Sequence, residues 1–275
     1  MTAEDQHGWH ASLHLGFEPR GDRTVLATRR QRGPLAVQRA FYPEGGPCHI
    51  YLLHPPGGVV GGDRLAINVA VAEGGHALIT TPGASKFYRS AGPEARLHQR
   101  LVVDDGGVLE WFPQANILFP GANLRARTDV ELTRGARFLG WEILSLGRAV
   151  IKERFDHGAA DLWFRVHRDG RPILIDRLRL RSKPDLDGIS GLRGYPISAT
   201  FIATGVNRQD LDAVRESLPH SDAAPFGTTL LEDLLVARCL DRSVESVERL
   251  FVALWGILRP GLLGRQPCSP RIWAT

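Results

Sequence analysis

The chain has 275 residues, 43% of them hydrophobic, which is enough apolar surface to bury a sizeable core. Basic residues outnumber acidic ones by 34 to 30, and a net charge of +4 is too small for a protein built around the phosphates of a nucleic acid. The acidic N-terminus does not resemble a secretory signal, and no segment approaches the roughly 20 apolar residues of a membrane span. We therefore expect a single domain, residues 1–275, that binds neither nucleic acid nor membranes.

Cysteine and glycine contents narrow the class further. Cys48, Cys239 and Cys268 are odd in number and widely spaced, with no Cys-x-x-Cys pair, which favours a reducing cytoplasmic location over a disulfide scaffold. Glycine accounts for 30 residues, about 11% against an average near 7%. This excess argues against an all-helical protein and favours many tight turns.

Apolar residues recur with period two through most of the chain, which predicts β-strands. The clearest alternations run through residues 9–17, 65–71, 97–103 and 162–175. Turns containing Asp-Gly follow at residues 104–107 and 168–171, and apolar runs on both sides of an Asp-Gly predict β-hairpins. We expect a mainly β fold of stacked antiparallel or mixed β-sheets, either β-solenoid-like or a sandwich.

About two helices are expected beside the strands. The main one lies near the C-terminus, where apolar residues recur every three or four positions over residues 244–258. Ser243 is its expected N-cap, and Arg259-Pro260-Gly261 its expected end. A shorter helix is expected over residues 208–217, whereas residues 181–195 resemble a long loop or hinge.

Residues 54–63 contain two glycine pairs, which invites comparison with a loop that binds phosphate. The spacing fits neither G-x-x-x-x-G-K-[ST] nor G-x-G-x-x-G, and the segment that follows has the pattern of a strand rather than a helix. We therefore expect tight turns or bulges that allow parts of the chain to approach closely.

Cys48, His49 and His54 offer a thiol and two imidazoles, which suit a transition metal. The spacing of a closed zinc site is absent, and adjacent residues of a strand point to opposite faces. A transient contact with a metal in transit is less demanding than a stable site, and it stays open.

Lys86 is one of three lysines and lies close to Tyr88 and Arg89 within residues 80–90. A lysine can form a Schiff base and a tyrosine can act as a general acid, so an enzyme is one interpretation. No histidine or acidic partner lies nearby in the sequence, and neither G-x-S-x-G nor H-E-x-x-H is present. A polar surface at the end of a strand is the preferred interpretation.

Five blocks, in the same order, resemble the urease accessory protein D family, whose members are called H in some bacteria. They are residues 52–63, 80–89, 109–114, 140–148 and 270–273, with the sequences LLHPPGGVVGGD, TTPGASKFYR, LEWFPQ, GWEILSLGR and PRIW. The resemblance covers nearly the whole chain.

The resemblance implies a non-enzymatic protein that helps to assemble the nickel site of urease. Members of the family are β-rich, and they link the urease structural subunits to accessory protein F, which docks the GTPase accessory protein G. We accordingly expect a hetero-oligomer containing two copies of the chain. No tightly bound cofactor is expected, and nickel would pass through a polar interior only transiently.

Candidate residues follow from the same blocks. Those expected to line a nickel passage are His54, Asp63, Glu110 and Glu142. Those expected to bind partners are Lys86, Tyr88, Arg89, Arg148, Arg271 and Trp273. Two alternatives remain for the first group: carboxylates paired with basic residues such as Lys86, Arg89 and Arg148, or a nickel store formed by Cys48, His49 and His54. For Tyr88, core packing is the preferred interpretation and an anchor in an interface is the alternative. A small-molecule enzyme using Lys86 and Tyr88 is a third function.

Overall fold

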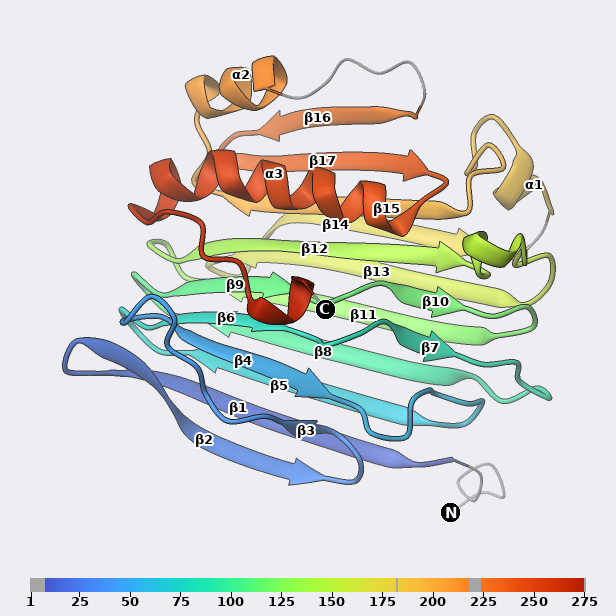
Figure 1. Cartoon of the computed structure of the whole chain (residues 1–275), viewed down its shortest axis with the longest axis horizontal. Helices are drawn as coiled ribbons and strands as arrows, with labels where there is room; N and C mark the ends of the chain where they lie inside the picture. The colour runs from blue at the N-terminus through green and yellow to red at the C-terminus, as the bar shows by residue number, and fades with distance from the viewer. Residues whose placement is uncertain (1–7, 182, 218–223, 275) are drawn as a thin grey trace.

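The computed structural model describes residues 8–181, 183–217 and 224–274. Its strands form two sheets, and the long C-terminal helix lies against one of them (Figure 1). This confirms the prediction of a mainly β fold with stacked, mixed sheets and a main helix near the C-terminus. None of the helices in the described ranges combines the length and the apolar character needed to span a membrane.

The seven-stranded sheet has a parallel interior. Strands β1, β5, β8, β11 and β13 run parallel to one another, and β2 and β14 pair antiparallel at the two edges. In spatial order the sheet consists of β14 (Arg171–Leu180), β13 (Ala159–Arg168), β11 (Asn123–Leu132), β8 (Ala95–Val103), β5 (Arg64–Val71), β1 (His10–Arg20) and β2 (Arg23–Arg32).

The ten-stranded sheet is parallel from β4 to β12 and antiparallel at both ends. Its main path is β16 (Phe226–Leu231), β17 (Leu234–Asp241), β15 (Ile197–Thr204), β12 (Arg137–Leu146), β9 (Val108–Phe112), β6 (His76–Thr80), β4 (Cys48–Leu53) and β3 (Ala36–Val37). Two short strands lie off this path: β10 (Asn116–Leu118) pairs with β12 and with β7 (Ser85–Phe87).

The middle of the chain winds like a solenoid, because successive coils add strands to both sheets. Turns at residues 72–75, 104–107 and 133–136 each carry the chain from one sheet to the other. The first two turns stack, with the Gly74 amide donating to the Asp105 carbonyl at 3.1 Å. The hairpin predicted at residues 104–107 is therefore wrong, since β8 and β9 lie in different sheets, whereas the hairpin predicted at 168–171 joins β13 to β14.

Three α-helices accompany the strands in the described ranges. Helix α2 (Arg208–Ser217) has the predicted bounds, and α1 (Lys183–Asp187) is a short helix inside the segment expected to be a loop. Helix α3 (Val244–Leu263) begins after Ser243, whose side chain accepts the Ser246 amide at 3.3 Å. Its predicted end is wrong: the helix continues through Pro260 to a left-handed Gly264, because a proline in the last turn forfeits only one backbone hydrogen bond. The described residues also form the 3-10 helices η2 (Ala149–Ile151) and η3 (Arg271–Ala274).

The hydrophobic core has two parts, one on each face of the ten-stranded sheet. Side chains of both sheets fill the first part, whose largest members include Trp111 and Phe138. The second part lies under α3, where Phe251 packs against Trp141 and Trp255 packs against Phe112. Because successive residues of a strand face opposite sides, the parity of a residue decides whether it enters the space between the sheets or the α3 layer.

Candidate functional site

Two cavities lie between the sheets. The first, which we call the His54 cavity, has a volume of about 230 Å³, and the second, the Asp176 cavity, about 470 Å³. Polar groups of the His54 cavity include His54, Thr81, Ser85, Lys86, Gln99, Asn116 and Glu142. Those of the Asp176 cavity include Asn116, Glu142, Asp176, Ser198, Thr200 and Arg238. Asn116 and Glu142 belong to both sets, so the two cavities adjoin at these side chains.

Glu142 projects from β12 toward the seven-stranded sheet. Its Oε1 accepts a hydrogen bond from Thr128 Oγ1 of β11 at 2.6 Å, and the same hydroxyl lies 2.8 Å from Gln99 Oε1 of β8. Burial raises the pKa of Glu142 to about 7, the Thr128 hydrogen bond opposes the rise, and the Asp176 charge adds to it. The Glu142 carboxyl therefore changes charge close to neutral pH.

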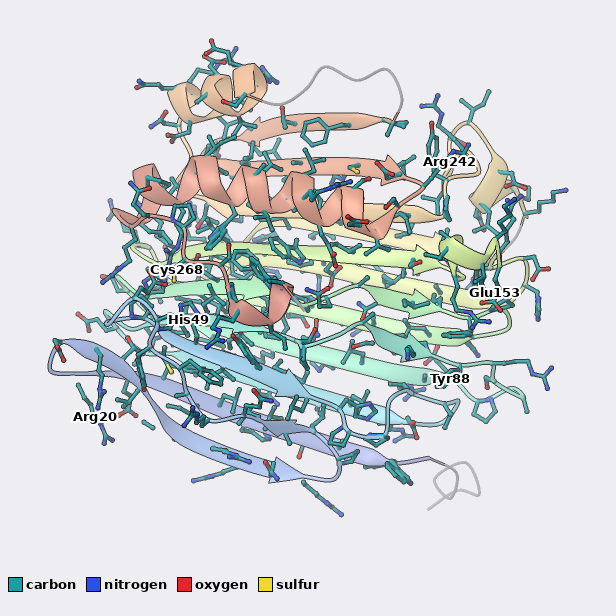
Figure 2. All side chains as sticks on the ribbon, viewed as in Figure 1. Arg20, His49, Tyr88, Glu153, Arg242 and Cys268 are labelled. Carbon is teal, nitrogen blue, oxygen red and sulfur yellow. The ribbon has the colours of Figure 1, made fainter. Side chains whose placement is uncertain are left out.

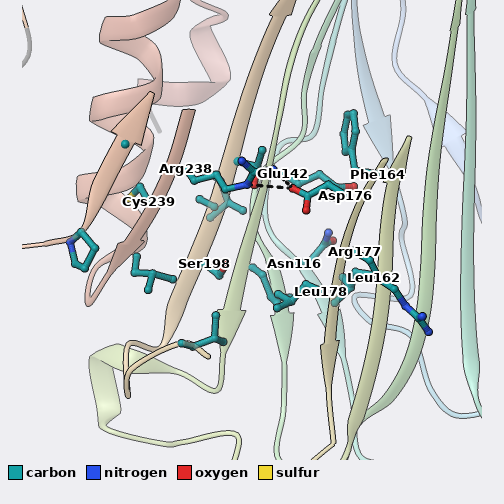
Figure 3. A pocket seen from close by; sticks show the side chains of 18 of the residues that line it. Asn116, Glu142, Leu162, Phe164, Asp176, Arg177, Leu178, Ser198, Arg238 and Cys239 are labelled. Carbon is teal, nitrogen blue, oxygen red and sulfur yellow. Dashed lines mark hydrogen bonds and ion pairs between the residues drawn. The ribbon is translucent and has the colours of Figure 1, made fainter. Parts of the chain in front are cut away.

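The Asp176 cavity has a second carboxylate. Asp176 of β14 accepts hydrogen bonds from Arg238 of β17, with Nη2–Oδ2 at 2.8 Å. Figure 3 shows Glu142 beside this pair, and all three side chains line the cavity. A cation at this point would meet carboxylate oxygens from both sheets, and Arg238 would compete with it for Asp176.

His54 follows β4 and lines the cavity that bears its name. Burial lowers the pKa of His54, and the Asp63 charge opposes this shift. The imidazole is therefore neutral at neutral pH, the form in which histidine binds a metal.

Asp63 and Glu110, two of the four predicted passage residues, do not line either cavity. Asp63 stabilises the glycine-rich turn, since its Oδ1 accepts the Trp9 amide at 2.8 Å and its Oδ2 accepts the Val60 amide at 2.9 Å. Glu110 is fully buried on the α3 side of the sheet, where its neighbour Trp111 faces the other way. The structure thus brings together only His54 and Glu142 from this set.

A buried polar cluster surrounds Glu110. Its Oε1 lies 2.7 Å from His76 Nε2. Its carboxylate accepts hydrogen bonds from the Arg259 guanidinium and from the Trp255 indole N–H, both on α3. Arg259 Nη2 also contacts Glu44 Oε1 at 2.6 Å, and His49 Nε2 lies 2.8 Å from that same oxygen. The cluster fastens α3 to the ten-stranded sheet and to the loop before β4.

The expectation that Lys86, Arg89 and Arg148 pair with the candidate carboxylates is wrong for Arg148. Arg148 forms a bidentate pair with Glu153, with Nε–Oε2 at 2.8 Å and Nη2–Oε1 at 2.9 Å. Glu110 takes Arg259 instead. Lys86 is exposed at the rim of the His54 cavity, and Arg89 is exposed beyond β7.

The predicted partner-binding residues divide between two regions. Tyr88 is 38% exposed and its ring packs at a tilt against Phe119, whose ring also lies under the Arg148 guanidinium. Figure 2 shows Tyr88 and Glu153 toward the same end of the strands. Trp273 donates through Nε1 to Thr80 Oγ1 at 2.9 Å and packs on Phe112. These contacts hold the C-terminal segment against the ten-stranded sheet. Arg271 begins the same 3-10 helix and is exposed.

The remaining metal hypothesis, Cys48 with His49 and His54, is not supported by the geometry. Cys48 is buried between the sheets, while His49 on the other face of β4 contacts Glu44. Within the described ranges, no group of three or more His, Cys, Asp or Glu side chains is placed to hold a metal ion. The expected transient contact with nickel remains a prediction.

Sequence reasoning missed Asp176, Thr128, Asn116 and Arg259. Arg259 gave a signal, because it follows Trp255 by four residues and therefore lies on the buried face of α3. Asp176 interrupts the inward-facing alternation of Leu174, Leu178 and Leu180 in β14. A polar residue at an apolar position of a strand was the signal for that site.

Two stacked sheets with polar cavities between them, and a helix fastened to one sheet, define a β-scaffold protein. Comparison with known proteins identifies the family, since the UreD urease accessory protein family matches residues 10–274. The chain belongs to this family. Membership confirms both the resemblance and the expectation of an accessory protein rather than an enzyme. The alternative of an enzyme that uses Lys86 and Tyr88 is not supported.

Relatives match over almost their full length. A protein of Alcanivorax borkumensis is 48% identical over 98% of this chain and 93% of its own length. One of Pseudomonas entomophila is 49% identical over 98% of this chain and 95% of its own, and one of Citrobacter koseri is 45% identical over 98% and 92%. Each of the three is named urease accessory protein UreD.

Proposed function

We propose that this chain acts in the maturation of urease as a scaffold that links the urease apoprotein to accessory proteins F and G. Family membership supports a maturation role, and the two-sheet fold with internal polar cavities supports a protein that binds and guides rather than one that reacts. The proposed assembly contains two copies of the chain and operates in the cytoplasm, to which three free cysteines are suited.

We further propose that nickel moves between the sheets, through the His54 and Asp176 cavities. The observation that carries this proposal is that Glu142 lines both cavities with a carboxyl whose pKa lies near 7. Imidazole and carboxylate are ligands that suit nickel. Because His54, Glu142 and Asp176 are not clustered into a closed site, each holds the ion weakly enough to release it.

The partner-facing residues remain proposals. Tyr88, Arg89, Arg148 and Lys86 belong to one end of the strands, close to the rim of the His54 cavity, and Arg271 and Trp273 belong to the C-terminal segment. A partner docked at the rim would receive or supply the metal directly.

The test uses urease co-expressed with its full set of accessory proteins. Glu142→Leu and His54→Leu in this chain should each lower the nickel content of purified urease several-fold, while the accessory complex still co-purifies. Glu245→Leu on α3 is the matched control, since that carboxylate is 77% exposed and lines neither cavity. Full nickel loading by the Glu142→Leu variant would reject the passage, and failure of the wild-type chain to co-purify with any urease component would reject the scaffold.

A further inference from the structure

The outer face of the seven-stranded sheet carries rows of arginine. In β8 the side chains of Leu97 and Leu101 point toward the core, so Arg96 and Arg100 point outward. Parallel pairing places outward residues of neighbouring strands side by side. One row contains Arg64, Arg96 and Arg125, a second contains His98, Arg127 and Trp163, and a third contains Arg100, Asp129 and Arg165.

Positive charge predominates on this face. Its arginines on β5, β8, β11, β13 and β14 are Arg64, Arg96, Arg100, Arg125, Arg127, Arg165, Arg177 and Arg179. Its carboxylates on the same strands are Asp129, Glu131 and Asp161. Neighbouring strands lie roughly 4.8 Å apart, so like charges in a row repel one another.

The carboxylates of the face are already engaged. Asp129 accepts a hydrogen bond from Arg165 Nε at 2.6 Å, and its Oδ2 lies 2.9 Å from His98 Nε2. Glu131 accepts a hydrogen bond from Arg100 Nη2 at 2.7 Å. Asp161 receives a bidentate pair from Arg177. Arg127, at the centre of the sheet, has no carboxylate partner within the described ranges.

A groove of about 630 Å³ opens on the same face, across β2, β1, β5 and β8. Gly16 and Ala70 are adjacent in register and provide a low floor, and Arg30 and Arg100 stand on either side. Glu18 and Asp104 also line the groove. Arg30 and Arg100 stand three strand spacings apart, about 14 Å at the backbone. An acidic segment lying across the groove would therefore meet Arg30 on one side and, on the other, Arg100, which also holds Glu131.

Among the described helices only α1 contacts this sheet, and it does so at the edge strand β14. Helix α3 packs on the ten-stranded sheet and α2 on α3 and β16, as Figure 1 shows. The side chains of Arg96, His98 and Arg100 are each more than half exposed. Parallel sheets are usually covered on both faces, so an uncovered parallel sheet with an arginine-rich face is suited to a partner.

We propose that the outer face of the seven-stranded sheet, from the Arg30–Arg100 groove to Arg127, binds an acidic surface of a protein partner. Arginine binds carboxylates through two parallel hydrogen bonds, which gives such a contact both energy and orientation. A protein is favoured over a nucleic acid because Asp129, Glu131 and Asp161 interrupt the rows and would repel a continuous phosphate chain. The proposal goes beyond the passage and the linking role, and it does not depend on either.

The experiment measures fluorescence anisotropy of a labelled glutamate-glycine peptide with the purified full chain. The test variant is Arg30→Glu with Arg127→Glu. The control is Arg208→Glu with Arg249→Glu, which makes the same change of charge on α2 and α3. Circular dichroism checks that both variants remain folded, and an oligouridylate of equal charge is titrated in parallel.

The expected result is salt-sensitive peptide binding that the test variant weakens about tenfold and the control hardly changes. Equal weakening by both variants would show that the peptide responds only to the net charge of the chain, and it would overturn the proposal. Absence of peptide binding, or tighter binding of the oligouridylate than of the peptide, would also overturn it.

Discussion

Arg259 and Glu110 form a bidentate ion pair in which both side chains are fully buried. Arg259 Nε lies 3.0 Å from Glu110 Oε2, and Nη2 lies 3.0 Å from Oε1. The pair joins α3 to β9, two segments separated by 149 residues along the chain. Its geometry makes α3 part of the ten-stranded sheet's structure rather than a loosely attached cover.

Replacing Arg259 with leucine should destabilise the chain strongly. The substitution leaves Glu110 buried without its cation, which typically costs about 3–5 kcal/mol. Urea unfolding followed by circular dichroism measures the loss. Arg249→Leu, on an exposed position of the same helix, is the control and should change the midpoint little. Adding Glu110→Leu to Arg259→Leu should recover part of the loss, and a single variant as stable as wild type would contradict the role of the pair.

Acid should weaken the same cluster. Burial alone would raise the pKa of Glu44, but hydrogen bonds from His49 and Arg259 overcome it and lower the pKa to about 2. Burial also opposes ionisation of Glu110, but contacts with His76 and Arg259 hold its pKa below the ordinary value. Since both folded-state pKa values are depressed, the stabilisation by both carboxylates is complete above about pH 4.5 and declines in acid. The part that Glu44 contributes is lost as the pH falls toward 2.

Glu44→Gln tests that pH dependence. The variant should lose roughly 1–3 kcal/mol at pH 7 and less at pH 3, where wild-type Glu44 begins to be protonated. The free energy of unfolding at the two pH values is the measurement. A difference between variant and wild type that does not shrink in acid would show that Glu44 contributes through packing instead.

Much of the fold could be predicted from local pattern. Period-two alternation located the strands, and the helical period with its cap signals located α2 and the start of α3. Parallel pairing could not be predicted, because the partner of a parallel strand lies many residues away and leaves no turn signal. The turn at 104–107 has the composition of a hairpin, yet it passes between sheets.

The candidate site shows the same limit. Glu110 and Glu142 each adjoin a tryptophan in similar segments, but Glu110 faces α3 and Glu142 faces the cavities. One residue of register decides the face. Partners such as Arg259 and Thr128 depend on contacts between distant elements, which the sequence alone did not place.

Glu142 should have the opposite effect on stability from Glu44. Its pKa is raised by burial to about 7 in the folded chain, above the ordinary unfolded value near 4.3. Ionising it therefore costs stability, increasingly so from about pH 4.3 up to pH 7 and constantly above that. Glu142→Gln should raise the free energy of unfolding by roughly 2–3 kcal/mol at pH 8 and have little effect at pH 4. A variant that is destabilised equally at both pH values would contradict the shifted pKa.

The glycine-rich turn should tolerate substitution at some positions and not at others. A Cβ on Gly61 would lie 2.7 Å from the Pro93 carbonyl oxygen and 2.1 Å from Ser90 Oγ, so backbone and side chain must both move. A Cβ on Gly58 would lie 2.1 Å from Cε2 of Tyr88, a ring that is 38% exposed and can turn away. Gly61→Ala should therefore cost about 1–3 kcal/mol, and Gly58→Ala less.

Gly83→Ala is the control for both substitutions, because nothing lies within 4 Å of its Cβ position. It should be neutral or slightly stabilising, since alanine restricts the unfolded chain more than glycine does. Thermal unfolding of the three variants gives the order directly. If Gly61→Ala proved as stable as Gly83→Ala, close approach of residues 61 and 93 would not be what requires glycine in this turn. The need for glycine would then rest on Gly58, where a Cβ would push the Tyr88 ring away from Phe119. Weaker partner binding by Gly58→Ala would measure that effect.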